Sequence, residues 1–209
     1  MANKATYVIG ITGGSGSGKT TLVQRLQSFF KEKSVSVLTM DNYYFARDHQ
    51  LTDENGIKNF DLPTSIDVRK FEEDLIKLIN GEAVCLQEYV FNNAEKVASE
   101  IVIEPAEVLI VEGLFVLHEE KIRERLDLSV FIHTKENIKV IRRIKRDRIE
   151  RNYPLDDVLY RYEHHVLPAF DAYIKPYVDD VDMVINNNKN FDKALELMKV
   201  FINSKLAVR

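Results

Sequence analysis

Short apolar runs alternate with longer segments of helical periodicity along most of the chain. The apolar runs, rich in β-branched residues and of the length of buried strands, lie at 6–11, 35–39, 108–112, 128–133 and 181–185. Apolar positions recur at helical spacing at 19–31, 67–80, 136–151 and 190–206. This alternation predicts an α/β fold with a parallel five-stranded sheet that helices flank on both faces.

One stretch departs from this alternation. Residues 84–104 hold two β-rich runs, VCLQEYVF and VASEIVIE, joined by the short polar segment NNAEK. Two such runs around a short polar joint are typical of a β-hairpin. Because 209 residues is a usual length for one domain, we expect a single domain over 1–209 with a small hairpin insertion at 84–104.

The segment GGSGSGKT at 13–20 fits the pattern G-x-x-x-x-G-K-[ST]. It follows the first predicted strand and opens the first predicted helix, so backbone N–H groups and the positive helix end can converge on phosphate oxygens. A flexible Gly/Ser turn is the alternative, but the flanking strand and helix favour a phosphate-binding loop. The residues expected to hold the nucleotide are Gly13, Gly14, Ser15, Gly16, Ser17, Gly18, Lys19, Thr20 and Thr21.

Two side chains of this loop carry specific chemistry. Lys19 would neutralise the β- and γ-phosphates, and the Thr20 hydroxyl would ligate Mg²⁺. A phosphate-binding loop also serves NTPases and GTPase switches. The base-reading motif NKxD of GTPases is not met, because residues 188–191 read NKNF, so guanine specificity has no support.

Two carboxylates follow predicted strands. Asp41 lies just past the second strand, and Glu112 ends the third. In a parallel sheet both strand ends open at the edge that holds the phosphate loop. These carboxylates could bind Mg²⁺ directly or through water, and one could accept the proton of an attacking hydroxyl. A turn or N-cap position is the alternative for Asp41.

Positive charge is concentrated in one predicted helix. Residues 142–151 contain six basic side chains against Asp147 and Glu150. Helical spacing does not allow all six to share one face, so some must be solvated. One interpretation is a charged surface helix. The other is a lid at 142–156 that closes over a phosphate donor and supplies arginines to the transferred phosphoryl group.

Composition limits the remaining classes of function. The chain has 29 basic and 33 acidic residues and a formal net charge of −4, which argues against a surface built for nucleic acid or anionic lipid. The single cysteine, Cys85, excludes an internal disulfide, and its apolar surroundings predict a packed thiol. The first residues do not read as a signal peptide, and no apolar run approaches ~20 residues. We therefore expect a cytoplasmic protein without membrane or nucleic-acid partners.

Several of these segments together resemble one family. GITGGSGSGKTT, MDNYY, NFDLPTSID, IVEG and IRRIKRDRIER occur in the order and spacing of the uridine kinase family of P-loop kinases, and the resemblance covers nearly the whole chain. It implies the P-loop NTPase fold and ATP-dependent phosphorylation of the 5′-hydroxyl of a pyrimidine ribonucleoside, as in pyrimidine salvage. It also implies magnesium as a cofactor and a homotetramer as the assembly.

The resemblance assigns roles to matching positions. Asp41 takes the place of the general base, and Thr20 and Glu112 fall at magnesium positions. Asp61 matches the carboxylate that grips the ribose hydroxyls, Tyr44 and Phe60 match neighbouring pocket positions, and Arg143 and Arg151 match lid or acceptor-contacting positions. Tyr89 and Phe91 match aromatic residues that hold the base, although an aromatic residue in a hairpin is more often part of a core or an interface.

The chain departs from the family pattern around the acceptor. Ala94 stands in place of a base-reading histidine, and Lys96 in place of the arginine that follows it. Tyr153 replaces a second arginine, and Arg161 replaces a glutamine. We expect the acceptor to be a nucleoside or a related small alcohol, because several changes in one pocket alter which polar groups the acceptor must satisfy. The alternatives are a kinase of the same family for a different alcohol and a non-catalytic nucleotide-binding regulator.

Overall fold

Five parallel strands form the central sheet. The computed structural model of the protein describes residues 6–30, 34–91 and 97–207. The strands are β1 (Tyr7–Thr12), β2 (Val35–Thr39), β5 (Val108–Glu112), β6 (Leu128–His133) and β7 (Met183–Asn186). They pair in the order β2-β5-β1-β6-β7, and every ladder is parallel. The predicted α/β fold with a five-stranded parallel sheet is therefore confirmed.

Helices cover both faces of this sheet. The long helices outside the carboxyl edge are α1 (Lys19–Gln27), α2 (Val68–Ile79) and α7 (Asp192–Leu206). Neighbouring residues of β1 alternate between two apolar clusters: Val8 belongs to the cluster that contains Leu75 of α2, and Ile9 belongs to the one that contains Leu22 of α1. Burial on both faces explains why the strands are continuous apolar runs in the sequence.

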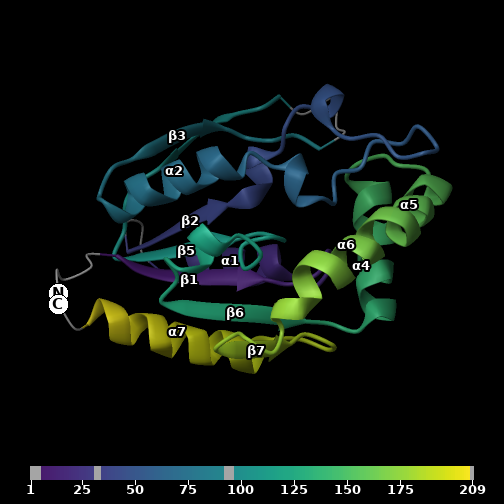
Figure 1. Ribbon diagram of the computed structural model, residues 1–209. Helices are drawn as coiled ribbons and strands as arrows, with labels where there is room; N and C mark the ends of the chain where they lie inside the picture. The colour runs from purple at the N-terminus through teal and green to yellow at the C-terminus, as the bar shows by residue number, and fades with distance from the viewer. Residues whose placement is uncertain (1–5, 31–33, 92–96, 208–209) are drawn as a thin grey trace.

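A helical arm stands at the carboxyl edge of the sheet (Figure 1). We use this name for residues 136–177, which comprise α4 (Glu136–Ile149), α5 (Leu155–Arg161), a π-helical turn (Tyr162–Val166), α6 (Leu167–Ala169), a second π-helical turn (Phe170–Ile174) and a 3₁₀ turn (Lys175–Tyr177). Val158, Val166 and Ile174 are buried, so this segment packs onto the rest of the molecule. The arm faces the strand ends at which ligands bind in α/β proteins.

The hairpin forms a separate two-stranded sheet. β3 (Val84–Gln87) and β4 (Glu100–Ile103) pair antiparallel, with Val84 opposite Ile103. Residues 92–96, and with them Ala94 and Lys96, lie outside the described residues. Val84 and Leu86 are buried, whereas Cys85 is exposed. The expectation of a packed thiol is wrong, because the two-residue period of a strand places Cys85 on the outer face.

Two boundaries differ from those expected. Helix α1 ends at Gln27, four residues early, and the Ser28 hydroxyl donates to the carbonyl of Arg25 there, a local bond that competes with further helix. Strand β7 begins at Met183, because the Asp182 carboxylate takes the backbone N–H of Ser129 in place of a ladder bond. The remaining short helical turns are η1 (Met40–Tyr43), η2 (Arg47–His49), η3 (Pro63–Ser65) and α3 (Glu120–Arg123).

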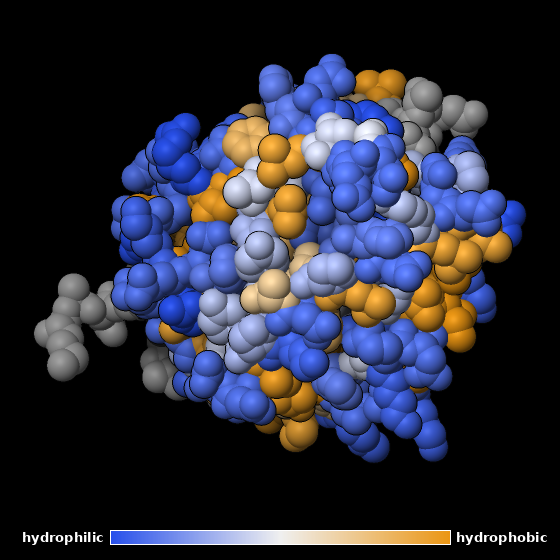
Figure 2. Space-filling view, turned by 45° about the vertical axis from the view of Figure 1, so that its right-hand side comes forward, coloured by the Kyte–Doolittle hydropathy of each residue, from blue (hydrophilic) through white to orange (hydrophobic). Residues whose placement is uncertain are grey.

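The surface that includes the arm is mainly hydrophilic, with scattered apolar groups (Figure 2). On the arm itself, Ile149, Leu155 and Leu159 are exposed. Within the described part of the chain, none of the helices combines the length and the apolar character needed to span a bilayer.

Candidate active site

The glycine-rich loop connects β1 to α1 and lies close against the arm. Gly18 has a left-handed conformation with φ of 98° and directly precedes Lys19, the first residue of α1. Gly16 has φ of 79°, and a Cβ there would come within 2.6 Å of the carbonyl oxygen of Lys139 in α4. A side chain at Gly16 would be strained and would push the loop off α4. The loop therefore needs glycine at position 16 to pack closely against α4.

Lys19 is buried inside this loop. Its Nζ donates to the carbonyl oxygen of Gly13 at 2.9 Å and reaches that of Gly14 at 3.4 Å. Burial lowers the pKa of Lys19. The described hydrogen bonds of this ammonium group go only to carbonyl oxygens of the loop. The group can replace them with hydrogen bonds to anionic oxygens, because anionic oxygens are stronger acceptors. The loop, the N-terminus of a nine-residue helix and this lysine thus fit a polyphosphate.

Side chains behind the loop fix the peptide of Ser17. Its carbonyl oxygen accepts hydrogen bonds from Asn187 Nδ2 at 2.7 Å and from the Thr134 hydroxyl at 3.1 Å. Arg142 reaches the same region and donates to the carbonyl oxygen of Asn187 at 3.1 Å. These bonds fix the position of the Ser17 peptide from within the protein.

Thr20 and Glu112 meet beside the loop. Glu112 ends β5, and its Oε1 lies 3.4 Å from the Thr20 hydroxyl and accepts a 3.0 Å hydrogen bond from the Thr39 hydroxyl. Burial, and then the nearby Asp41 carboxylate, raise the pKa of Glu112 above its usual range. A hydroxyl and carboxylates are the oxygen ligands that Mg²⁺ prefers in proteins. The sequence reasoning missed Thr39, although it stands opposite Glu112 in the β2–β5 register.

Asp41 lies in the turn η1 directly after β2. The N-cap of this turn is Thr39, whose hydroxyl oxygen accepts from the backbone N–H of Asp41 at 3.4 Å. The Asp41 carboxylate is therefore not the capping group. No hydrogen bond or ion pair of this carboxylate is found among the described residues, and it lines the cavity beside the loop. A carboxylate so placed is able to accept a proton from a bound hydroxyl.

A single cleft of about 1250 Å³ unites these groups; it runs from the loop to the hairpin and the arm. The predicted site residues that line it are Ser15, Gly16, Gly18, Lys19, Thr20, Thr21, Asp41, Tyr44, Phe60, Asp61, Tyr89, Phe91, Glu112, Arg143 and Arg151. Gly13, Gly14 and Ser17 lie behind this surface as the backbone of the loop. We call this cavity the cleft below.

Asp61 and Arg143 connect the two ends of the cleft. Arg143 Nη1 lies 3.3 Å from Asp61 Oδ1 and donates to the Ser15 hydroxyl at 2.9 Å. Both Asp61 and Arg143 are buried. Paired charges tolerate burial far better than single ones, so this contact accounts for the burial of both groups.

Asp147 forms ion pairs with three arginines of the arm. Its carboxylate lies 3.1 Å from Arg143 Nε, 2.8 Å from Arg146 Nε and 3.4 Å from Arg151 Nη1. Burial opposes ionisation of Asp147, but the three guanidinium groups outweigh it and hold its pKa below the usual range. Sequence reasoning missed this role, although Asp147 stands four residues from both Arg143 and Arg151 and so shares their helix face.

The other basic residues of this helix divide as helical spacing requires. Lys145 and Arg148 are exposed, whereas Arg146 is half-buried and its Nη2 reaches the Ser15 hydroxyl at 3.4 Å. The expectation that some of the six are solvated is confirmed. The buried face of α4 thus presents arginines to the phosphate loop.

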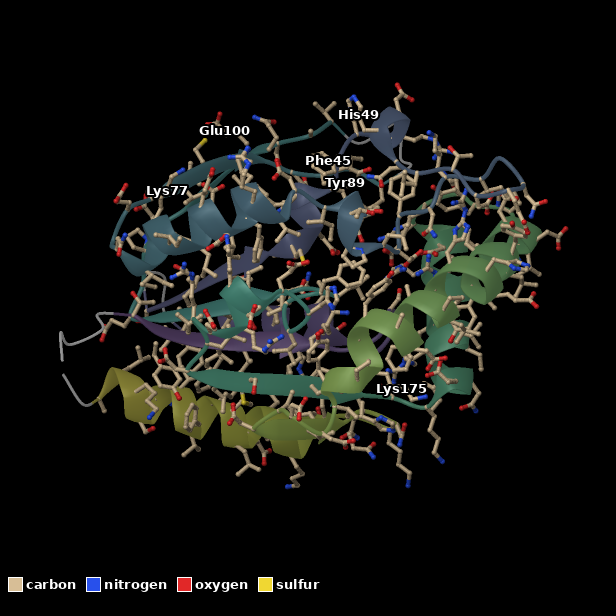
Figure 3. The ribbon with its side chains drawn as sticks, viewed as in Figure 1. Phe45, His49, Lys77, Tyr89, Glu100 and Lys175 are labelled. Carbon is tan, nitrogen blue, oxygen red and sulfur yellow. The ribbon has the colours of Figure 1, made fainter. Side chains whose placement is uncertain are left out.

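Aromatic rings form the far wall of the cleft. The ring centroids of Tyr89 and Phe91 are 4.7 Å apart. The ring centroid of Tyr44 lies 5.4 Å from that of Tyr89 and 5.3 Å from that of Phe91. Asn42 Oδ1 accepts the backbone N–H of Tyr89 at 3.1 Å, which ties the hairpin to η1. The Arg151 guanidinium lies 4.1 Å from the centre of the Phe91 ring. Figure 3 labels Tyr89 near the end of the hairpin that faces the arm.

Two of the departures from the family pattern lie in this part of the cleft. Tyr153 and Arg161 both line it, and the Arg161 guanidinium lies 5.3 Å from the centre of the Tyr153 ring. Arg161 Nη1 also donates to the backbone carbonyl of Lys58 at 2.6 Å. Arg161 is thus bound to the protein backbone, which a sequence comparison alone does not reveal.

Comparisons with known proteins agree with this architecture. A solved structure described as a possible uridine kinase from Bacillus stearothermophilus superposes with a TM-score of 0.61 over 88% of this chain and 90% of that one, at 19% identity, and so shares the fold. A uridine kinase of Streptococcus agalactiae serotype V is 34% identical over 204 residues, which are 98% of this chain and 96% of that protein.

A uridine kinase of Staphylococcus aureus strain Newman is also 34% identical, over 96% of this chain and 97% of that protein. The model of the phosphoribulokinase/uridine kinase family matches residues 8–194. That span begins in β1, contains the whole cleft and ends in α7. The chain therefore belongs to the phosphoribulokinase/uridine kinase family and is a kinase of the uridine kinase type.

Proposed function

We propose that the protein transfers the γ-phosphate of ATP to the 5′-hydroxyl of a pyrimidine ribonucleoside. The observation that carries this proposal is one cleft that holds a phosphate loop at one end, aromatic rings at the other and the Asp41 carboxylate between them. The relatives named uridine kinase support the same reaction.

At the donor end, the loop amides and Lys19 bind the β- and γ-phosphates. Lys19 leaves the carbonyls of Gly13 and Gly14 and places its charge on the phosphate oxygens. Thr20, Glu112 and Asp41 are the residues that would hold Mg²⁺, directly or through water. When bound, that ion neutralises negative charge on the phosphate oxygens.

At the acceptor end, Asp61 accepts hydrogen bonds from the ribose hydroxyls and the base packs between Tyr89, Phe91 and their aromatic neighbours Tyr44 and Phe60. This arrangement directs the 5′-hydroxyl toward Asp41, which takes its proton as the oxygen attacks phosphorus. Aromatic rings and a carboxylate supply the apolar and polar contacts that a nucleoside needs.

Between the two ends, Arg143 and Arg151 stabilise the charge of the transferred phosphoryl group. Arg143 already contacts Ser15 of the loop, and both arginines are held by Asp147. Guanidinium groups fixed in advance need little reorganisation during the reaction. The arm would then act as the lid of the cleft.

A second candidate is a kinase of the same family for a different small alcohol. Tyr153 and Arg161 favour it, because they stand in the cleft where the family pattern has other polar groups. We also propose a cytoplasmic homo-oligomer, for which the exposed Ile149, Leu155 and Leu159 of the arm offer apolar surface.

The test is a steady-state assay of ADP formation with Mg²⁺-ATP and a panel of uridine, cytidine, purine nucleosides and small sugar alcohols. We expect turnover with uridine or cytidine. The Asp41→Asn variant should lose about 10² to 10⁴-fold in kcat and keep its affinity for ATP, whereas Asp48→Asn, at an exposed position, should keep full activity.

The outcomes separate the candidates. Turnover only with a non-nucleoside alcohol would replace the proposed acceptor. Absence of ADP formation with uridine, cytidine and every other nucleoside would contradict the proposed reaction.

A further inference from the structure

The chain segment that leads into the acceptor site is a small loop of its own. Residues 51–59, which we call the acceptor loop, form a tight turn in which Thr52 pairs with Lys58, and the N–H of Asn59 donates to the carbonyl of Leu51 at 2.8 Å. Phe60 and Asp61 follow directly. Whatever fixes this loop therefore fixes the start of the acceptor site.

The tip of the loop is attached to the arm through Asp53. Asp53 Oδ2 accepts from the Tyr160 hydroxyl at 2.9 Å and lies 2.7 Å from His165 Nε2. Asn55 Nδ2 donates to the same Tyr160 hydroxyl at 2.7 Å. The other oxygen, Oδ1, accepts the backbone N–H groups of Asn55 and Ile57. One carboxylate thus closes the turn and binds two side chains of the arm.

His165 is placed for this contact by the shape of the arm. It lies in the π-helical turn Tyr162–Val166 and is 2% exposed. A π-helical turn adds one residue to a helix and so rotates the residues around it relative to an α-helix. Because an ionised carboxylate only accepts hydrogen bonds, Nε2 of His165 must carry the proton. Its neighbour His164 is exposed and makes no hydrogen bond to Asp53 among the described residues, but its ring centroid lies 4.4 Å from that of Tyr160.

The base of the loop has a second attachment. Arg161, four residues before His165, donates to the backbone carbonyl of Lys58 at 2.6 Å. Lys58 in turn donates through Nζ to the carbonyl of Gln50 at 2.8 Å. The tip and the base of the acceptor loop are therefore both bonded to residues 160–165 of the arm.

Hydrogen bonds of Asn59 connect the acceptor loop to Asp61 and to Ser65. Asn59 Oδ1 accepts the backbone N–H of Asp61 at 2.9 Å, and the Asn59 carbonyl accepts the Ser65 hydroxyl at 3.0 Å. A shift of the loop would therefore move Asp61 relative to Arg143. Misplacement of a reacting group by about 1 Å can cost ~10²-fold in rate.

We infer that Asp53, His165 and Arg161 are positioning residues, which fasten the acceptor loop to the arm and thereby hold Phe60 and Asp61 in place for the acceptor. The inference rests on the proposed function for its kinetic part only. Arg161 departs from the family pattern, and in this positioning role it does not need to contact the base.

The kinetic test compares His165→Leu with His165→Gln, whose side-chain amide retains a donor. With uridine as acceptor, we expect His165→Leu and Asp53→Asn to raise the KM for uridine about 10-fold and leave the KM for ATP within twofold. His165→Gln should recover most of the loss. The matched controls are His49→Leu and Asp48→Asn, at exposed positions of η2, and should match the wild type.

A second measurement does not depend on activity. Hydrogen exchange of the amides at 53–59 should become faster in His165→Leu and Asp53→Asn, and stay unchanged in the controls. Unchanged exchange would overturn the attachment, and faster exchange with an unchanged KM for uridine would overturn its positioning role. If the wild type does not phosphorylate uridine or any other nucleoside, the proposed function fails, while the exchange measurement still decides whether the loop is fastened.

Discussion

The donor and acceptor ends of the cleft are built in different ways. At the donor end, the phosphate loop is one continuous motif, residues 13–21, to which Asp41 and Glu112 add side chains from two neighbouring strand ends. The acceptor end is assembled from side chains of η1, the acceptor loop, the hairpin and the arm. Backbone contacts survive most substitutions, whereas side-chain contacts change with each one. The same fold can therefore keep its phosphate donor while its acceptor changes.

The two ends also differ in how they are held. The loop is fixed from behind by Thr134 and Asn187, which bond the carbonyl of Ser17 within the parallel sheet region. The acceptor side depends on contacts between the hairpin, the acceptor loop and the arm. The position of the phosphate loop therefore depends on few contacts, whereas the acceptor side depends on contacts among three separate segments.

Removal of Arg143 should have the largest effect, because it contacts both ends. We expect Arg143→Leu to lower kcat by about 10³ to 10⁵-fold, the range for an arginine at a transferred phosphoryl group. Arg143→Lys should recover only part of this, since it keeps the charge but loses the planar fork. Arg148→Leu, at an exposed position of the same helix, is the control. A loss below tenfold, in a variant with unchanged unfolding temperature, would contradict the proposed role.

Replacement of Lys19 should affect the donor end alone. We expect Lys19→Met to lower kcat/KM for ATP about 10² to 10³-fold, as for one preorganised donor at developing charge. The KM for the acceptor should stay within twofold. Rate assays with each substrate varied at saturating levels of the other will show this. An equal rise in the KM for ATP and the KM for the acceptor would contradict the expectation that Lys19 acts at the donor end alone.

Replacement of Phe91 should affect the acceptor end alone. Phe91→Leu removes a ring that packs against Tyr89 and Arg151, and aromatic contacts of this kind contribute about 0.5 to 1.5 kcal/mol. We expect the KM for the nucleoside to rise about 2- to 10-fold, with the KM for ATP unchanged. Phe45→Leu, at an exposed ring near Tyr89 in Figure 3, is the matched control. A change in the KM for ATP would count against this assignment.

The smallest effect concerns stability in acid. Desolvation opposes ionisation of Asp53, but the N–H of Ile57 and the donors from His165 and Tyr160 hold its pKa at about 2. Because this pKa is depressed in the folded state, the carboxylate contributes stability that is present above about pH 4 and lost as the pH falls through about 2. We expect Asp53→Asn to lower the unfolding temperature at pH 6, and the difference from wild type to narrow toward pH 2. A difference independent of pH would refute this.

The sequence allowed the sheet, the phosphate loop and the hairpin to be predicted, because each rests on neighbouring residues. Runs of apolar residues mark the strands, and the pattern from Gly13 to Thr20 is contiguous. Asp41 and Glu112 could be placed together because both follow strands of one parallel sheet. Arguments of this kind need only the order of the elements along the chain.

Other features depend on contacts between segments that are distant in the sequence, so they could not be predicted from the sequence. Asp53 meets His165 across more than a hundred residues, and a π-helical turn is not distinguishable from an α-helix by periodicity alone. The exposure of Cys85, in contrast, could have been predicted, because Val84 and Leu86 share one face of the strand and Cys85 shares the other face with Gln87. Asp147 could have been identified, since its spacing from Arg143 and Arg151 is visible in the sequence.

The double contact of Arg143 has a thermodynamic consequence. One guanidinium bonds Ser15 at the donor end and Asp61 at the acceptor end, so a nucleotide that draws it toward the loop releases a carboxylate oxygen for the acceptor. We expect the two substrates to bind with positive coupling, and linkage requires each to tighten the other by the same factor. Titration of a non-hydrolysable ATP analogue with and without uridine measures this factor, and equal affinities would contradict it. Such coupling leaves ATP loosely held when acceptor is scarce, which limits the loss of phosphate to water.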